Sequence, residues 1–171
     1  KSLIRLAKIK VSAIKVSSGL VTNFPLIGEA IKRKIPTIIS TGFATNKDLD
    51  KLKKFINKYK FKKIAILKCT SNYPADPSHL DLNSINYLKK KFNLVTGYSD
   101  HSLGDLAPVA AVSCGAKIIE KHFTLNKLYE GTDHILSATQ KELKELRTIG
   151  DNIFLLRGNR QKTVTKEEKK I

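Results

Sequence analysis

The chain has 171 residues, enough for one ordinary domain with a sizeable core. It carries 32 Lys and Arg against 15 Asp and Glu, a formal net charge of +17, but the lysines are scattered over predicted helical faces rather than gathered in one block. Because arginines do not alternate with exposed aromatic residues, we expect no nucleic-acid partner. No apolar run reaches the roughly 18 residues needed to cross a membrane, and no signal peptide is visible, so we expect no membrane partner and a cytoplasmic location.

Cys69 and Cys114 are the only cysteines, and each lies alone in an apolar run, which predicts two buried free thiols. The chain begins with Lys1 and contains no methionine, so we expect a processed chain or a fragment of a longer one.

Five short β-rich runs alternate with segments of helical periodicity. The strands are predicted at 13–17, 37–40, 64–68, 94–96 and 117–120, and the helices at 25–34, 46–59, 83–92, 106–114 and 139–156. The strand runs are continuously apolar, as in sheets buried on both faces, and the alternation predicts parallel βαβ units. Thr45 is the expected N-cap of the second helix, and Gly115 the stop of the fourth.

The last segment, 158–171, is charged and almost devoid of apolar residues. It is expected to be a linker or a frayed end, which leaves 1–157 as the folded domain.

Small or polar residues follow every predicted strand. They are Ser17-Ser18-Gly19, Ser40-Thr41-Gly42, Cys69 to Pro74, Ser99-Asp100-His101 and His122-Phe123-Thr124. Because parallel strands end at one edge of a sheet, these groups are expected to surround a common centre suited to a phosphorylated or polyhydroxylated small molecule. Lys15, within the first strand, is expected to add a buried positive charge, the alternative being a lysine that reaches solvent.

His101 and His122 lie 21 residues apart, at corresponding ends of neighbouring strands. Strands about 4.8 Å apart allow two such histidines to share one metal ion, although a single histidine there is more often a hydrogen-bonded loop residue. His79 is expected at the surface or in a loop, and the role of His134 is left open.

Two charged residues beside these histidines have alternative roles. Asp100 either orients a metal-ligating histidine or caps a helix. Lys121 is a candidate for a Schiff base, without support from its neighbours.

Five segments carry a resemblance that spans about residues 13–156. They are Lys15-Val16-Ser17-Ser18-Gly19, Ser40-Thr41-Gly42, Cys69-Thr70-Ser71-Asn72-Tyr73-Pro74, Gly97-Tyr98-Ser99-Asp100-His101-Ser102-Leu103-Gly104 and Glu120-Lys121-His122-Phe123-Thr124. Together they resemble the N-acetylneuraminate (sialic acid) synthase family, which includes the legionaminate, pseudaminate and spore-coat polysaccharide synthases.

The resemblance implies an α/β fold of the (β/α)8 TIM-barrel type, of which this chain holds about five βα units as the C-terminal portion. It implies condensation of phosphoenolpyruvate with an N-acetylmannosamine-type sugar, giving a nine-carbon 2-keto acid and phosphate in surface polysaccharide biosynthesis. It also implies a divalent metal, Mn2+ in most members, and a homodimer for the full-length protein.

By the same resemblance, His101 and His122 are the metal ligands and, with Lys15, the catalytic residues. The residues implied to hold phosphoenolpyruvate are Lys15, Ser18, Ser40, Ser71, Tyr73 and Ser99, with Ser71 in place of an asparagine found in some members. Asp133 is implied to bind the sugar.

The chain departs from the family pattern in two respects. Leu20 stands where many members carry a glutamate near the metal and the substrate, and three of the eight βα units are absent. These departures favour the alternative of a non-catalytic, truncated or degenerate relative that serves as a binding or association module.

Overall fold

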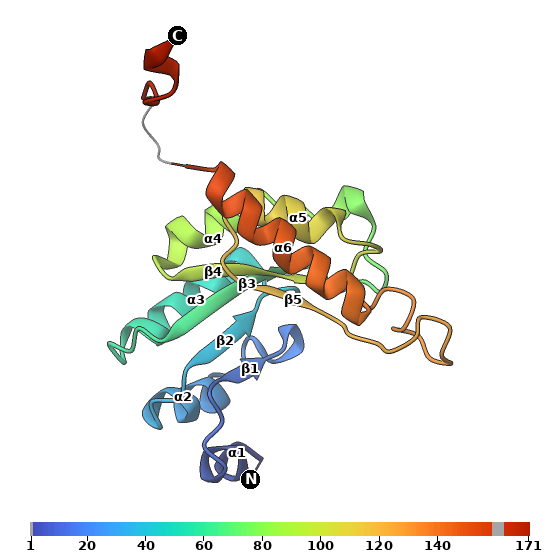
Figure 1. The fold of residues 1–171 in the computed structure, drawn as a ribbon. Coiled ribbons are helices and arrows are strands. Elements are labelled where there is room, and N and C mark those ends of the chain that lie inside the picture. The colour runs from blue at the N-terminus through green and yellow to red at the C-terminus, as the bar shows by residue number, and fades with distance from the viewer. Residues whose placement is uncertain (1, 159–162) are drawn as a thin grey trace.

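The computed structural model describes residues 2–158 and 163–171, and a five-stranded parallel sheet lies at its centre (Figure 1). The strands, which lie side by side in chain order, are β1 (Ile14–Val16), β2 (Thr37–Ser40), β3 (Ile64–Cys69), β4 (Val95–Asp100) and β5 (Ile119–Lys121). The helices are α1 (Ser2–Lys8), α2 (Phe24–Lys32), α3 (Asn46–Asn57), α4 (Ser84–Phe92), α5 (Leu106–Ser113) and α6 (Gln140–Leu156). Short 3-10 turns are η1 (Ser18–Leu20), η2 (Pro77–His79) and η3 (Glu168–Lys170).

All five predicted strands and all five predicted helices are present, with bounds shifted by a few residues. The largest shift is in β4, predicted at 94–96, which continues to Asp100 because its hydrogen-bonded pairing with β5 extends to the partners Asp100 and Lys121. Ser99 and Asp100, expected after the strand, are therefore part of it. Helix α1 was not predicted, since it has only seven residues and buries only Leu3.

The core lies between the sheet and the helices that cover its outer face. Val16, Ile39 and Ile66 project from β1, β2 and β3 and are fully buried against residues that include Ile27 of α2 and Leu52 of α3. A second cluster forms where Tyr98 of β4 packs among residues of α4 and α5. Because side chains alternate along a strand, every second residue is left on the opposite, inner face of the sheet.

Two threonines start the longest helices in the same way. Thr45 caps α3, as predicted, and Thr139 caps α6; each hydroxyl accepts a hydrogen bond from a backbone N–H of the first turn. The carboxylates of Asp48 and Glu142 in turn accept a hydrogen bond from the backbone N–H of the cap residue, which completes a capping box in each case. Gly115 follows α5 with φ of +104°, a conformation in which glycine is strongly favoured.

Within the described residues the sheet has two open edges, because β1 pairs only with β2 and β5 pairs only with β4. The five βα units thus form an open half-barrel, as expected. Part of the predicted linker, residues 159–162, lies outside the described residues, while η3 lies beyond α6 and away from the sheet (Figure 1). In the described part of the chain, no helix has the length and apolar character to cross a membrane.

Candidate functional site

A pocket of about 380 Å³ lies at the carboxyl ends of the strands. Eight of the predicted site residues line it: Lys15, Ser18, Ser40, Ser71, Tyr73, Ser99, His101 and His122. The remaining lining residues are Ser17, Gly19, Phe43, Cys69 and Glu120. All five strands, or the turns that follow them, contribute to one cavity, which is where α/β barrels place their chemistry.

Strand alternation explains which side chains reach the pocket. On β4, Ser99 and His101 face inward, whereas Tyr98 packs among the helices of the outer face. On β5, Glu120 and His122 face inward in the same way. The parallel register places Ser99 beside Glu120, so both strands present a polar residue and a histidine two positions later.

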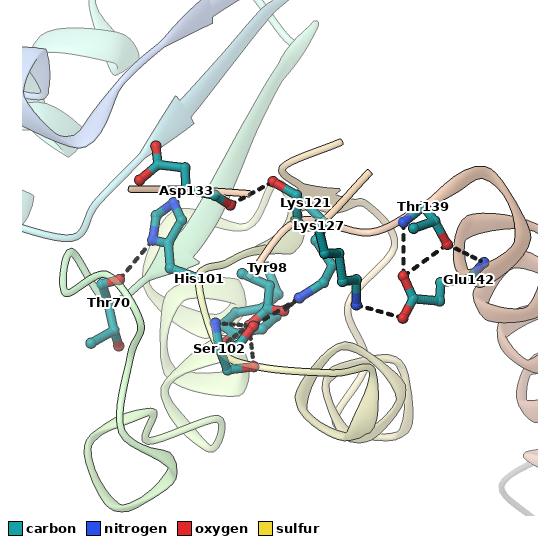
Figure 2. Close-up of polar contacts among 11 residues, drawn as sticks. Thr70, Tyr98, His101, Ser102, Lys121, Lys127, Asp133, Thr139 and Glu142 are labelled. Atoms are coloured by element: carbon teal, nitrogen blue, oxygen red, sulfur yellow. Dashed lines mark hydrogen bonds and ion pairs between the residues drawn. The ribbon is translucent and has the colours of Figure 1, made fainter. Parts of the chain in front are cut away.

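The two histidines lie close together, with ring centroids 5.3 Å apart and ring planes nearly perpendicular. His101 Nδ1 lies 2.8 Å from the carbonyl oxygen of Thr70, which only accepts hydrogen bonds, so Nδ1 carries a proton and donates it (Figure 2). In the neutral form of the His101 ring, the free lone pair is then on Nε2. Tyr73 covers the His101 ring at a centroid distance of 4.0 Å.

These donors fit a divalent metal held by two imidazoles. A ligating histidine usually donates its other ring N–H to a carbonyl or carboxylate, as His101 does to Thr70. His122 Nδ1 lies 3.4 Å from Asp133 Oδ2 in the loop between β5 and α6. Residues 2–158 and 163–171 contain no group of three or more His, Cys, Asp and Glu placed to hold a metal. The two histidines would therefore leave several coordination positions to water and substrate oxygens.

Glu120 joins the opposite sides of the pocket. Its Oε1 lies 3.0 Å from Lys15 Nζ and accepts a hydrogen bond of 2.7 Å from Ser99 Oγ. No role was predicted for Glu120 from the sequence. Its position two residues before His122, on the same side of the strand, is the signal that would have identified it. Lys15 is not buried as expected, because the side chain keeps 30% of its exposure on an edge strand.

Hydroxyl groups line the other wall of the pocket. Ser40 Oγ is buried and has no hydrogen-bond partner among residues 2–158 and 163–171, so it is available to a ligand. Ser18 Oγ accepts a hydrogen bond from the backbone N–H of Gly42. A Cβ at Gly42 would lie 2.2 Å from Ser71 Oγ and 2.8 Å from Ser18 Oγ, so glycine is required for the two serines to approach each other here.

Cys69 is a free and buried thiol, as predicted, but it lines the pocket beside His101. Burial by itself raises the pKa of the thiol. Hydrogen bonds with His101, Ser18 and Ser71 outweigh burial and lower the pKa from 9.0 to about 7. The same contact, with the bond to Thr70, raises the pKa of His101 against the effect of its own burial. Cys114 is free and only partly buried, where the sequence predicted full burial.

Asp100 and Lys121 are outside the pocket, since both face the opposite side of their strands. Lys121 Nζ lies 2.5 Å from Asp100 Oδ2, and the two side chains are 2% and 0% exposed. The Schiff-base alternative for Lys121 is therefore wrong, because no substrate reaches its amine. Asp100 neither contacts a histidine ring nor caps a helix: it bonds Tyr98, Ser102 and Lys121.

Four other residues singled out in the sequence do not line the pocket. Leu20 is 42% exposed on η1 and does not line the pocket. His79 is exposed on η2, as expected. His134 bonds Thr124 Oγ1 at 2.8 Å in the loop between β5 and α6. Asp133, from the same loop, reaches the rim of the pocket through its contact with His122.

Sugar acid synthases are among the relatives of this chain. A family model described as the NeuB family matches residues 1–162. The N-acetylneuraminate-9-phosphate synthase of Drosophila melanogaster is 38% identical over 156 residues, which are 91% of this chain and 42% of that protein. The N,N'-diacetyllegionaminic acid synthase of Legionella pneumophila is 39% identical over 145 residues, 82% of this chain and 41% of that protein.

The same relationship appears among solved structures. The N-acetylneuraminic acid synthetase of Leptospira borgpetersenii serovar Hardjo-bovis, solved in complex with citrate, superposes with a TM-score of 0.92 at 33% identity. The match covers 98% of this chain and 59% of that chain. The present chain thus spans about two fifths of the length of the curated relatives it matches.

Proposed function

The chain belongs to the NeuB family of sugar acid synthases, and we propose that it carries the catalytic pocket of such an enzyme. The proposed reaction condenses phosphoenolpyruvate with an N-acetylmannosamine-type sugar to give a nine-carbon 2-keto acid and phosphate, for surface polysaccharide biosynthesis. The observation that carries this proposal is the convergence of Lys15, four serines, Tyr73 and two histidines on one pocket.

The pocket suits the two anionic groups of phosphoenolpyruvate. Lys15 supplies a positive charge, and Ser18, Ser40, Ser71 and Ser99 supply hydroxyl donors around it. Glu120 holds Lys15 and Ser99 in the ligand-free protein. A bound phosphate or carboxylate takes over these donors, and the Glu120 carboxylate is then free to accept a hydrogen bond from a hydroxyl of the sugar.

His101 and His122 would hold the metal, with His101 oriented by the carbonyl of Thr70. A divalent ion bound there would polarise the sugar aldehyde, the Lewis-acid role common to such sites. Two imidazole nitrogens with open positions suit Mn2+ among other divalent ions. Sugar binding is assigned to Asp133 in this proposal, and its proximity to His122 and its hydrogen-bond-accepting carboxylate support the assignment.

Leu20 leaves the pocket without a carboxylate on the η1 side. Glu120 is then the one carboxylate that lines the cavity within the described part of the chain. The alternative of a non-catalytic binding module stays a prediction, supported by the open edges of the sheet. The homodimer and the cytoplasmic location also stay predictions.

The test is binding followed by turnover. The purified full chain is titrated with phosphoenolpyruvate in the presence and absence of Mn2+ by calorimetry, and then assayed with N-acetylmannosamine for phosphate release coupled to 2-keto acid formation. We expect Mn2+-dependent binding and turnover, both lost in His101→Ala. Lys91→Met, which removes a surface ion pair with Asp50, is the matched control and is expected to behave as wild type.

The outcomes separate the two candidate functions. Binding of phosphoenolpyruvate without turnover favours the binding-module alternative. Absence of both binding and turnover in a folded chain contradicts the proposed function.

A further inference from the structure

The residues that immediately precede the two histidines form a buried ion pair on the outer face of the sheet. Asp100 of β4 and Lys121 of β5 are direct partners in the parallel register. Lys121 Nζ donates to Asp100 Oδ2 at 2.5 Å and to the carbonyl oxygen of Ser102 at 2.9 Å. Their side chains are essentially without solvent exposure. Each strand thus presents one member of the pair outward and, one residue later, a histidine inward.

The second carboxylate oxygen of Asp100 is occupied as well. Oδ1 accepts hydrogen bonds from Tyr98 Oη at 3.0 Å, from the Ser102 backbone N–H at 3.0 Å and from Ser102 Oγ at 2.7 Å. The bonds to Ser102 close the turn that follows His101. Figure 2 shows Lys121 extending toward Tyr98 and Ser102 while His101 points away from them, toward Thr70.

The side chain of His122 contacts the rings of Tyr73 and His101 and approaches Asp133, but few bonds hold its backbone. Strand β5 has only three residues and pairs with β4 alone in the described part of the chain. Beyond the strand, the carbonyl oxygen of His122 accepts a hydrogen bond from the Ala138 N–H at 2.7 Å. The Asp100–Lys121 pair is therefore the buried side-chain link between β5 and β4 on the outer face, and the Ser99–Glu120 bond is its counterpart on the inner face.

A buried ion pair adds little net stability compared with well-packed apolar residues, and its best-attested use is to specify register. We propose that Asp100 and Lys121 are positioning residues: they lock β4 and β5 in register so that His101 and His122 meet across the pocket. This inference rests on the proposed function for its use of the histidines as metal ligands. The ion pair and the approach of the two histidine rings do not require a bound metal.

The experiment observes the histidine rings of the metal-free full chain by NMR. The chain has four histidines, so single His→Gln variants assign every ring signal. In wild type we expect a nuclear Overhauser effect between the rings of His101 and His122, whose centroids are 5.3 Å apart. The test variant is Asp100→Asn with Lys121→Met, which removes both charges and leaves no unpaired buried ion. Lys91→Met, at the surface pair with Asp50, is the control.

We expect the double variant to lose at least half of the ring-to-ring effect and to bind Mn2+ at least about tenfold more weakly, while the control matches wild type in both. A folded double variant with the wild-type ring signals and Mn2+ affinity overturns the inference, whatever its thermal stability. If the double variant does not fold, Tyr98→Phe removes one hydroxyl bonded to Asp100. Shifted His101 and His122 signals in this variant support the inference, and unchanged signals overturn it.

The two proposals fail separately. A wild-type chain that neither binds Mn2+ nor turns over phosphoenolpyruvate contradicts the proposed function, and the ring signals of the metal-free chain still decide whether the ion pair positions the histidines.

Discussion

At the scale of single residues, the chemistry of the pocket follows from which face of a strand each side chain occupies. In the segment from Ser99 to Ser102, Ser99 and His101 belong to the pocket, whereas Asp100 bonds residues on the outer face. Neighbours in the sequence therefore have unrelated roles. Residues far apart in the sequence can in turn share one site: Cys69, predicted only as a buried free thiol, lies on β3 and contacts His101 at the end of β4.

The thiol of Cys69 gives a prediction that needs no substrate. Because its pKa is lowered from 9.0 to about 7, we expect the rate at which iodoacetamide modifies Cys69 to reach half of its maximum near pH 7. Mass spectrometry of the peptide that contains Cys69 measures this rate. His101→Ala removes a hydrogen bond that favours the thiolate, so the midpoint should move to higher pH. Cys69→Ser identifies the modified peptide. A midpoint near pH 9 in wild type would contradict this account.

At the scale of elements, the loop between β5 and α6 is held by the start of α6. Lys127 Nζ contacts Glu142 Oε1 at 2.5 Å, and Glu142 Oε2 accepts hydrogen bonds from the Thr139 N–H and hydroxyl at 2.8 and 2.9 Å. Figure 2 shows Lys127, Thr139 and Glu142 together at this point. Asp133 lies on the loop between Lys127 and Thr139, so the capping box also limits the movement of the residue proposed to bind the sugar.

This junction predicts a pH dependence of stability. The bonds from Lys127 and Thr139 lower the pKa of Glu142 from 4.5 to about 2. A carboxyl whose pKa is depressed in the folded state stabilises it above the unfolded pKa, and that contribution is lost as the pH falls from about 4.5 to about 2. We expect urea denaturation to show a smaller loss of unfolding free energy between pH 5.5 and 3 in Glu142→Gln than in wild type.

Glu145→Gln serves as the control for this measurement, because Glu145 has only a distant, exposed pair with Lys141 at 4.0 Å. It should keep the wild-type loss of unfolding free energy between the two pH values. An equal pH dependence in wild type and Glu142→Gln would show that the Lys127–Glu142 contact does not form in solution.

At the scale of the whole molecule, the half-barrel leaves two strands with one unpaired side each in the described residues. Exposed strand edges are templates for pairing with another chain. Apolar side chains near the end of α6 add to this tendency, since Phe154, Leu155 and Leu156 are 61%, 75% and 84% exposed. We therefore expect the architecture that assembles the pocket to favour association of the chain as well.

We expect sedimentation velocity of the full chain to give a mass above 19.1 kDa that rises with protein concentration. Phe154→Lys with Leu156→Lys should shift this distribution toward the monomer by adding charge to the exposed apolar end of α6. Asn152→Lys, at an exposed polar position of the same helix, adds charge without removing an apolar side chain and serves as the control. A constant monomer mass over the concentration range would contradict the prediction.

The sequence by itself determined the order and type of nearly all elements, because continuous apolar runs and capping signals such as Thr45 are local. It also determined the common edge of the polar residues, since parallel strands end together. Only the tertiary structure decided that Lys15 pairs with Glu120, that Asp100 pairs with Lys121 and that Cys69 contacts His101. These contacts join residues 21 to 105 positions apart, and they depend on strand register and on side-chain direction, neither of which a local pattern specifies.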